Sequence, residues 1–291
     1  MRSPILAASL AAAVLAAPGA ARANTDRDWS RSWPVEKSAV VRVVTDDAKV
    51  RIHRGEPGQV SARVTYHSRT WGLAGGERIP QVVLEKESDA IRIEARERSN
   101  WVVFGGVETR FEMDVTVPPD CDLSVRSGDG SITCDPLSGR ISLESGDGRI
   151  HCSGLRGDLV LWSGDGNIEA DSLDGSLMAR TTDGRLRVGG RFDSLDLRSG
   201  DGRLEAVVAR GSQLASAWSV QSGDGPIVFR IPRNLSAMLD ASSHDGSLQI
   251  DLPITTRGRI RENNLSGQLN GGDVPLRIRS GDGSITIGLS E

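Results

Sequence analysis

A column of regularly spaced aspartates is the clearest candidate for chemistry in this sequence of 291 residues. The tetrapeptide Ser-Gly-Asp-Gly recurs along the chain, and the aspartates of the first five repeats lie 18 residues apart: Asp129, Asp147, Asp165, Asp183 and Asp201. Carboxylates repeated along one edge of a stack could bind calcium between repeats, as they do in secreted proteins with nonapeptide repeats. Alternatively, the aspartate and serine side chains tie each turn to its own backbone as Asx-turns.

The spacing favours the structural role over calcium. In the calcium-binding repeats an aspartate occurs every nine residues, whereas here it occurs every 18 and lies three positions before the next core residue instead of two. We expect arginines two residues further on to offset the carboxylate charge: Arg149, Arg185 and Arg203. We also expect glycines with positive φ to form the bends. These turn glycines are Gly128, Gly130, Gly146, Gly148, Gly164, Gly166, Gly200 and Gly202.

The cysteines and histidines offer little further chemistry. Cys134 and Cys152 lie 18 residues apart, so stacked repeats would bring their Cα atoms within disulfide range, although two reduced core thiols are an equally open alternative. Cys121 falls at a turn position and is expected to stay unpaired. The four histidines lack metal-ligand spacing, and the sequence has no nucleophile elbow or phosphate loop. We therefore expect no cofactor and no enzyme, with a polysaccharide-active β-helix enzyme as the weakest alternative.

The elements that position these residues follow a period of nine residues. Two apolar columns run two positions apart with polar residues between them, which is typical of half-buried strands. One column contains Ile132, Ile141, Ile150, Leu159, Ile168, Leu177, Leu186, Leu195 and Leu204. Only every second turn is Ser-Gly-Asp-Gly, which favours a solenoid over an antiparallel meander, because a solenoid places all those turns along one edge. The prediction is an all-β, single-stranded β-solenoid, or β-helix, with 18-residue coils and two short strands per coil.

The two ends of the chain depart from the repeat. A positive start at Arg2, an apolar run at 5–17 and Ala-Arg-Ala at 21–23 predict a signal peptide over residues 1–23. Residues 24–120 are expected to form an irregular β-rich cap with degenerate early coils, since Thr45 to Val50 fits the repeat frame. The solenoid is then expected over 121–291, with two coils after residue 245 and a degraded turn near 265–267.

Charge and export limit the partners. Removal of the signal peptide takes the formal charge from −4 to −6, which gives no support for nucleic-acid binding. No other apolar run reaches the length of a membrane span, so we expect an exported protein that is periplasmic, secreted or at the cell surface. Val160, Trp162 and Met178 form an outward apolar patch, which could be a contact site for an envelope protein or a polysaccharide. We favour its coverage by the N-terminal region, which carries Trp71 and Trp101.

These features resemble a family of exported bacterial domains of unknown function, labelled "putative adhesin", with β-solenoid folds. The resemblance rests on a strand ending in Val-Pro-Pro at 117–119 and on the alternation of Gly-Asp-Gly turns with Leu-x-Gly turns. It also rests on the ending, where Gly-Gly-Asp at 271–273 precedes the last repeat. It covers most of residues 40–289 and implies a non-enzymatic interaction protein of the envelope or surface. A calcium-binding β-roll-like repeat protein is the alternative.

Overall fold

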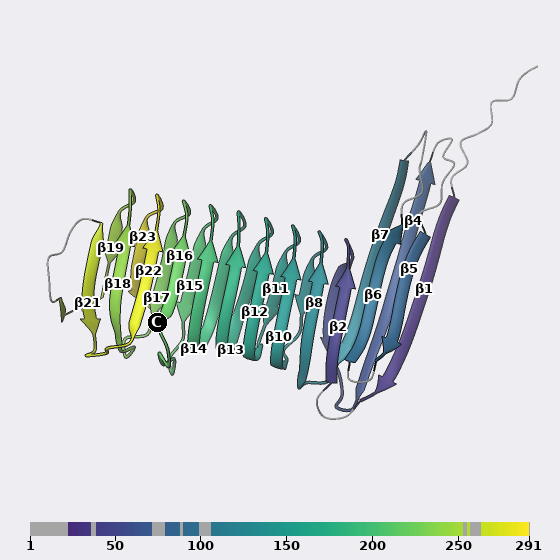
Figure 1. The fold of residues 1–291 in the computed structure, drawn as a ribbon, viewed down its shortest axis with the longest axis horizontal. Coiled ribbons are helices and arrows are strands. Elements are labelled where there is room, and N and C mark those ends of the chain that lie inside the picture. Colours follow the sequence, from purple (N-terminus) through teal and green to yellow (C-terminus); the bar gives the residue numbers. More distant parts are fainter. Residues whose placement is uncertain are drawn as a thin grey trace, which may run out of the picture.

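The computed structural model describes residues 23–35, 39–71, 79–87, 90–98, 106–252, 255–256 and 263–290. Residues 1–22, which carry most of the predicted signal peptide, lie outside this part. Every helix or strand among the described residues is a β-strand, and the strands stack into an elongated molecule (Figure 1). The predicted all-β solenoid is confirmed.

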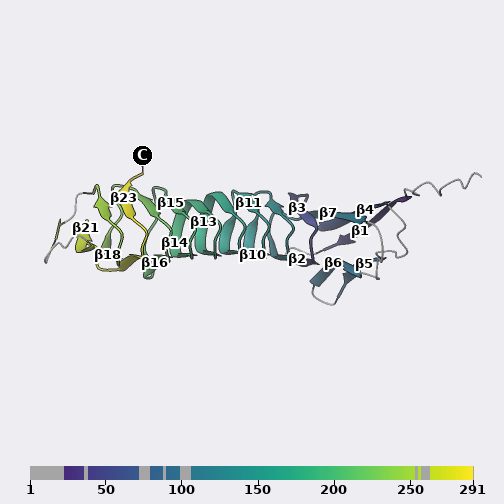
Figure 2. The ribbon, with the colours of Figure 1, turned by 90° about the horizontal axis from the view of Figure 1, so that it is seen from above.

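Two sheets face each other along the length of the stack, as the view from above shows (Figure 2). The front sheet faces the viewer in Figure 1. In spatial order it contains β5 (Ile79–Lys86), β6 (Ala90–Arg98), β2 (Ala39–Thr45), β8 (Cys121–Ser127), β10 (Ser138–Ser145), β12 (Arg156–Ser163), the second halves of β13 (Ile168–Thr181) and β14 (Leu186–Ser199), β16 (Trp218–Ser222), β22 (Pro275–Ser280), β18 (Ala237–Ser243), β21 (Asn264–Leu269) and β20 (Thr255–Thr256).

The rear sheet completes each coil. In spatial order it contains β1 (Ala23–Pro34), β4 (Gln59–Trp71), β7 (Gly106–Val117), β3 (Lys49–Arg54), β9 (Ile132–Cys134), β11 (Ile150–Ser153), the first halves of β13 and β14, β15 (Leu204–Val208), β17 (Ile227–Ile231), β23 (Ile285–Leu289) and β19 (Leu248–Ile250). Throughout the repeat, each strand lies parallel to its equivalent in the next coil, which excludes the meander.

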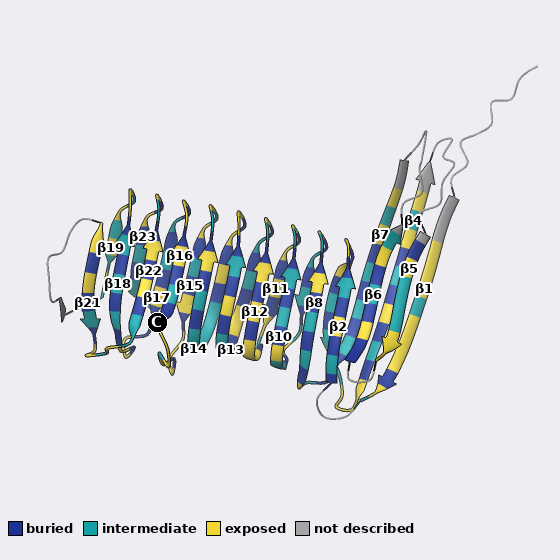
Figure 3. Cartoon of the chain, viewed as in Figure 1, coloured by how far each residue is buried: buried dark blue, intermediate teal, exposed yellow. Residues whose placement is uncertain are grey.

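The apolar columns form a continuous core between the two sheets. Ile132, Ile150 and Ile168 lie opposite one another in parallel register, 18 residues apart, and each is fully buried. The remaining members of the column are at most 2% exposed, and burial alternates along most strands of the repeat (Figure 3). Since the inward residues repeat without a slip, the coils can share one core without sideways displacement.

The C-terminal coils do not stack in chain order, and this corrects our prediction. We expected residues after 245 to add two further coils in sequence. Instead, the last coil, β22–β23, lies between the β16–β17 coil and the β18–β19 coil. Residues 265–267 belong to β21, which pairs antiparallel with β18 and covers its edge. The chain therefore runs past one position in the stack and returns to fill it, so its last strand is paired on both sides.

The N-terminal end shows the same arrangement. The β2–β3 coil lies between the β6–β7 coil and the β8–β9 coil, although β6 and β7 follow it in the chain. Thr45 lies opposite Ser127 and Val50 opposite Ile132, so this early coil keeps the repeat frame. Beyond it the two sheets splay apart into an arm of β5 and β6 and an arm of β7, β4 and β1 (Figure 2).

Candidate functional site

A column of buried hydroxyls ties the Ser-Gly-Asp-Gly turns to one another. Ser145 is fully buried; its Oγ donates to the carbonyl of Gly130 in the preceding coil at 3.0 Å and accepts from the Gly148 amide of its own turn at 3.0 Å. Paired hydroxyls occupy this position along the stack: Thr45, Ser127, Ser145, Ser163, Thr181, Ser199, Ser222, Ser280 and Ser243. The hydroxyl thus satisfies buried backbone groups that strand pairing leaves free.

The turn glycines are required for close packing and not for positive φ, which corrects our prediction. None of the predicted turn glycines has a positive φ. A Cβ on Gly148 would lie 2.2 Å from the carbonyl oxygen of Gly130, and one on Gly166 2.2 Å from that of Gly148. Positive φ occurs instead at the opposite edge, for example at Gly157. The absent side chain therefore lets the turns of neighbouring coils stack in contact.

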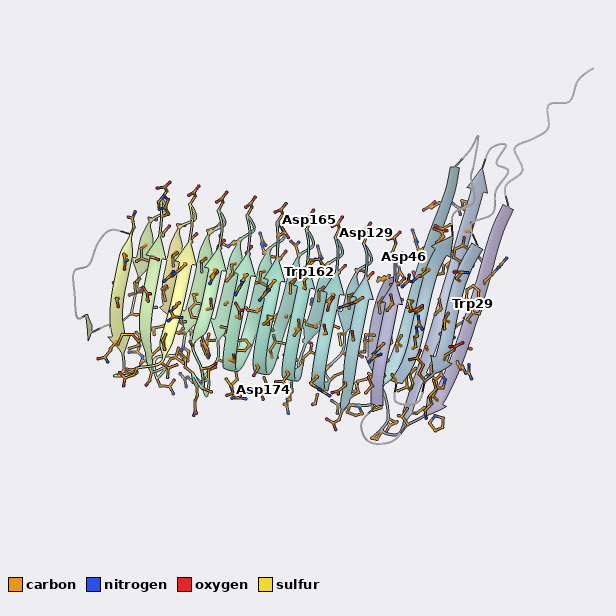
Figure 4. All side chains as sticks on the ribbon, in the orientation of Figure 1. Trp29, Asp46, Asp129, Trp162, Asp165 and Asp174 are labelled. Atoms are coloured by element: carbon orange, nitrogen blue, oxygen red, sulfur yellow. The ribbon has the colours of Figure 1, made fainter. Side chains whose placement is uncertain are left out.

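The aspartate column projects from this edge into solvent, as Asp129 and Asp165 do in Figure 4. Among the described residues, none of its five predicted carboxylates accepts a hydrogen bond, so they do not form the expected Asx-turns. Arg149 and Arg185 form no described ion pair, and Arg203 pairs with Glu205 instead. The expected charge compensation is therefore absent from the described contacts. Partial burial, Asp47 and Asp147 raise the pKa of Asp129.

The described residues contain no cluster of three side chains suited to hold a metal ion. Each Ser-Gly-Asp-Gly turn contributes one aspartate to the column. Calcium binding remains the less favoured alternative to a structural role. A rise in melting temperature with millimolar calcium that is abolished by Asp147→Asn and Asp165→Asn would establish it.

The three cysteines are buried free thiols. Cys134 and Cys152 lie opposite each other in the paired strands β9 and β11, as the 18-residue spacing predicted. Cys121 is the first residue of β8 and points into the core, so its predicted turn position is wrong. Burial raises the pKa of the Cys121 and Cys152 thiols to about 12, which makes them poor nucleophiles at neutral pH.

An apolar cluster lies on the front sheet. We favoured its coverage by the N-terminal region, but none of the described N-terminal strands covers it. Val160, Trp162 and Met178 expose 38%, 43% and 39% of their surfaces. Val160 lies directly opposite Met178 in the paired strands β12 and β13, and the exposed Trp162 is the last residue but one of β12, near the edge of the Ser-Gly-Asp-Gly turns (Figure 4). Trp101 and the side chain of Trp71 lie outside the described residues. We call these three residues the apolar patch.

A shallow groove of about 350 Å³ runs from β2 to β12 and ends at the apolar patch. Ser124 and Ser142 lie in register with Val160, and these short side chains leave the space that longer ones would fill. Asp122, Arg140 and Asp158 line the groove beside them, and the Arg140 Nε donates to Asp122 at 3.1 Å. This ion pair holds the pKa of the Asp122 carboxyl below its usual range.

The groove was not predicted from the sequence, although a signal for it was present. At 18-residue intervals the charge alternates from Asp122 to Arg140 to Asp158. Opposite charges at equivalent positions of stacked coils predict cross-strand ion pairs. The small size of Ser124 and Ser142 in the neighbouring row is what opens the groove.

Comparisons with known proteins identify the family. A model of the family described as Toastrack DUF4097 matches residues 41–288. The comparison with curated proteins finds no match.

Solved structures resemble the chain at low sequence identity. A "putative lipid binding protein" from Parabacteroides distasonis has 12% identity and a TM-score of 0.38, with 91% of this chain and 97% of that chain covered. A "putative adhesin" from Bacteroides fragilis has 10% identity and a TM-score of 0.35 at the same coverage. A "putative cell adhesion protein" from Clostridium sporogenes has 12% identity and a TM-score of 0.27, with 91% and 100% covered.

Proposed function

We propose that this chain, which belongs to the Toastrack DUF4097 family, is a non-enzymatic exported interaction protein of the cell envelope or cell surface. The observation that carries the proposal is the apolar patch. Equivalent outward positions in neighbouring coils are polar, for example Ser142 and Glu144, whereas Val160 and Trp162 are exposed on the same face. Burial of exposed tryptophan and methionine side chains against a partner lowers the free energy of the complex. Such a cluster is therefore typical of a contact surface.

Two carboxylates of the front sheet are poor candidates for the general acid that a polysaccharide-cleaving enzyme needs. A general acid must retain its proton near neutral pH. The Asp122 carboxyl is ionised there, because its bond to Arg140 lowers its pKa. Glu144 forms an ion pair with the Arg126 guanidinium, whose Nε lies 2.9 Å from the Glu144 Oε2. Both carboxylates are therefore paired within the sheet.

The predicted export supports an envelope location. The signal-peptide features at residues 1–23 carry this part of the proposal, and the structure describes only the last of these residues. No helix among the described residues has the length and apolar character needed to cross a membrane. The described structure also contains few buried polar side chains beyond the hydroxyl column, so the mature chain can fold around its own core.

Co-sedimentation with isolated envelopes of the source bacterium tests the proposal. The wild-type protein without its signal peptide is expected to pellet with envelopes, and the triple variant Val160→Ser, Trp162→Ser and Met178→Ser is expected to remain in the supernatant. Val207→Ser is the matched control, because Val207 is 42% exposed but lies on the rear sheet. Failure of the wild-type protein to pellet, or equal pelleting of the patch variant, would contradict the proposal.

A further inference from the structure

We infer that the groove of the front sheet, together with Trp162, binds a neutral glycan chain that lies along the solenoid axis. This inference rests on the proposed function and names the class of ligand that the same face recognises. It depends on the shape of the groove, its charge, its hydrogen-bonding groups and the exposed indole beside it.

The shape of the groove suits an extended ligand. The groove crosses β2, β8, β10 and β12, with Val40 on the first of these strands and Val160 on the last. Neighbouring strands are about 4.8 Å apart, so three steps give a length of about 14 Å. Its volume of about 350 Å³ falls within the range of ligand sites. A chain of sugar rings can occupy such a groove and continue beyond its open end.

The charge of the groove favours a neutral ligand. Its lining carries two arginines, Arg42 and Arg140, and two aspartates, Asp122 and Asp158, so the formal charges cancel. Since these charges cancel, neither an anionic polymer, such as a nucleic acid or a uronate chain, nor a cationic peptide gains net electrostatic attraction from the lining. A neutral ligand meets no net repulsion, and paired guanidinium and carboxylate groups remain available to its hydroxyls.

The hydrogen-bonding groups of the groove are side chains. Each strand that it crosses is paired on both edges, so no free strand edge is available to add a peptide strand. What the groove presents instead is the hydroxyls of Ser124 and Ser142 with the charged groups of Asp122 and Arg140. These groups can both donate to and accept from the many hydroxyls of a sugar.

Trp162 supplies the apolar surface for a sugar ring. It lies two residues along β12 from Val160, which lines the groove, and both side chains are on the same face. One face of a pyranose ring presents mainly C–H groups, which pack on the face of an aromatic ring, while its hydroxyls point outward. The combination of an exposed indole with hydroxyl, guanidinium and carboxylate groups matches this division of the sugar.

Affinity electrophoresis tests the inference directly. The mature protein is run in native gels that contain laminarin, glucomannan, dextran or hydroxyethyl cellulose as neutral probes, with alginate as the anionic probe. Trp162→Ala removes the platform, and Ser142→Met fills the groove with a side chain that the same row already holds at Met178. Val207→Ala is the control on the rear sheet.

At least one neutral polysaccharide is expected to retard the wild-type protein, and both groove variants are expected to bind about tenfold more weakly. The control should match the wild type. Retardation of the wild type by alginate alone or by no probe would overturn the inference. So would neutral-probe retardation of Trp162→Ala and Ser142→Met that equals that of the wild type.

A second measurement separates this inference from the proposed function. Envelopes are treated with periodate, which oxidises vicinal diols of sugars, or with a protease, before co-sedimentation. Loss of binding after periodate but not after protease supports a glycan ligand. Binding that survives periodate, is lost after protease and still requires the apolar patch would overturn the glycan inference and leave the proposed function standing. A wild-type protein that binds no envelopes at all contradicts the proposed function itself.

Discussion

The column of buried hydroxyls should stabilise the solenoid through its hydrogen bonds and not through the volume that its side chains fill. Substitutions of Ser145 allow the two contributions to be separated. Ser145 makes two hydrogen bonds of 3.0 Å, one to each of two neighbouring turns. The comparison uses Ser145→Thr and Ser145→Val, which differ only in a hydroxyl or a methyl group at one branch. A β-branched residue fits, because Thr181 occupies the same position in the stack.

Valine at this position leaves the Gly148 amide and the Gly130 carbonyl without their partner in a buried site. Each lost bond costs about 1–2 kcal/mol when its partner stays buried, so we expect Ser145→Val to be less stable than Ser145→Thr by about 2–4 kcal/mol. Equilibrium denaturation in urea measures the difference. Hydrogen exchange at the Gly148 amide reports it locally, since a solenoid can open one coil at a time.

The matched pair gives a clear refutation. A stabilising role of the hydroxyl is refuted if the unfolding free energies of Ser145→Val and Ser145→Thr agree within about 0.5 kcal/mol and the Gly148 amide exchanges equally fast in both. Loss of the hydroxyl would then cost no more than an ordinary surface substitution does. The column would then be a consequence of the repeat and not a cause of its stability.

Gly148→Ala is expected to destabilise by about 3 kcal/mol or more, because its Cβ meets the preceding coil at 2.2 Å, whereas Gly288→Ala has no atom within 4 Å and should change stability little; similar urea midpoints for the two would be wrong for this packing. Deletion of residues 275–290 should abolish hydrogen-exchange protection in β18 and β19 as well, because the missing coil joins them to the stack; native protection there would contradict the observed strand order. Asp129→Asn should raise stability at pH 7, since the raised pKa of Asp129 means that its charged form opposes folding, and the gain should vanish below about pH 4, where the carboxyl is protonated in both states; a gain that persists at low pH would exclude this cause. The three buried thiols should react with a thiol reagent only after unfolding, and fast reaction of the native protein would contradict their burial.

The repeating part of the fold could be predicted because its inward residues recur at fixed intervals. Ile132 to Leu204 and the constant turn were sufficient to favour parallel stacking, and the register of the strands confirms it. The order of the terminal coils could not be predicted in this way. Every coil uses the same frame. The coil that starts at Pro275 therefore fits against β16 just as a coil that directly follows β16 and β17 in the chain would fit.

The surface features were less accessible from the sequence. The apolar patch was predicted from outward positions, but its exposure depends on where the N-terminal strands go, and they extend the stack along its axis instead of folding over it. The groove depends on the sizes of side chains in neighbouring coils. Ser124 and Ser142 become a depression only beside longer residues such as Arg140 and Val160.

The central claim is that the repeated edge builds the fold and the front sheet makes the contact. Envelope co-sedimentation of two triple variants tests it most directly. One removes the carboxylates of the edge by Asp129→Asn, Asp147→Asn and Asp165→Asn, and the other is the patch variant Val160→Ser, Trp162→Ser and Met178→Ser. We predict that the edge variant pellets like the wild type and the patch variant does not. Loss of pelleting in the edge variant with full pelleting in the patch variant would contradict the account.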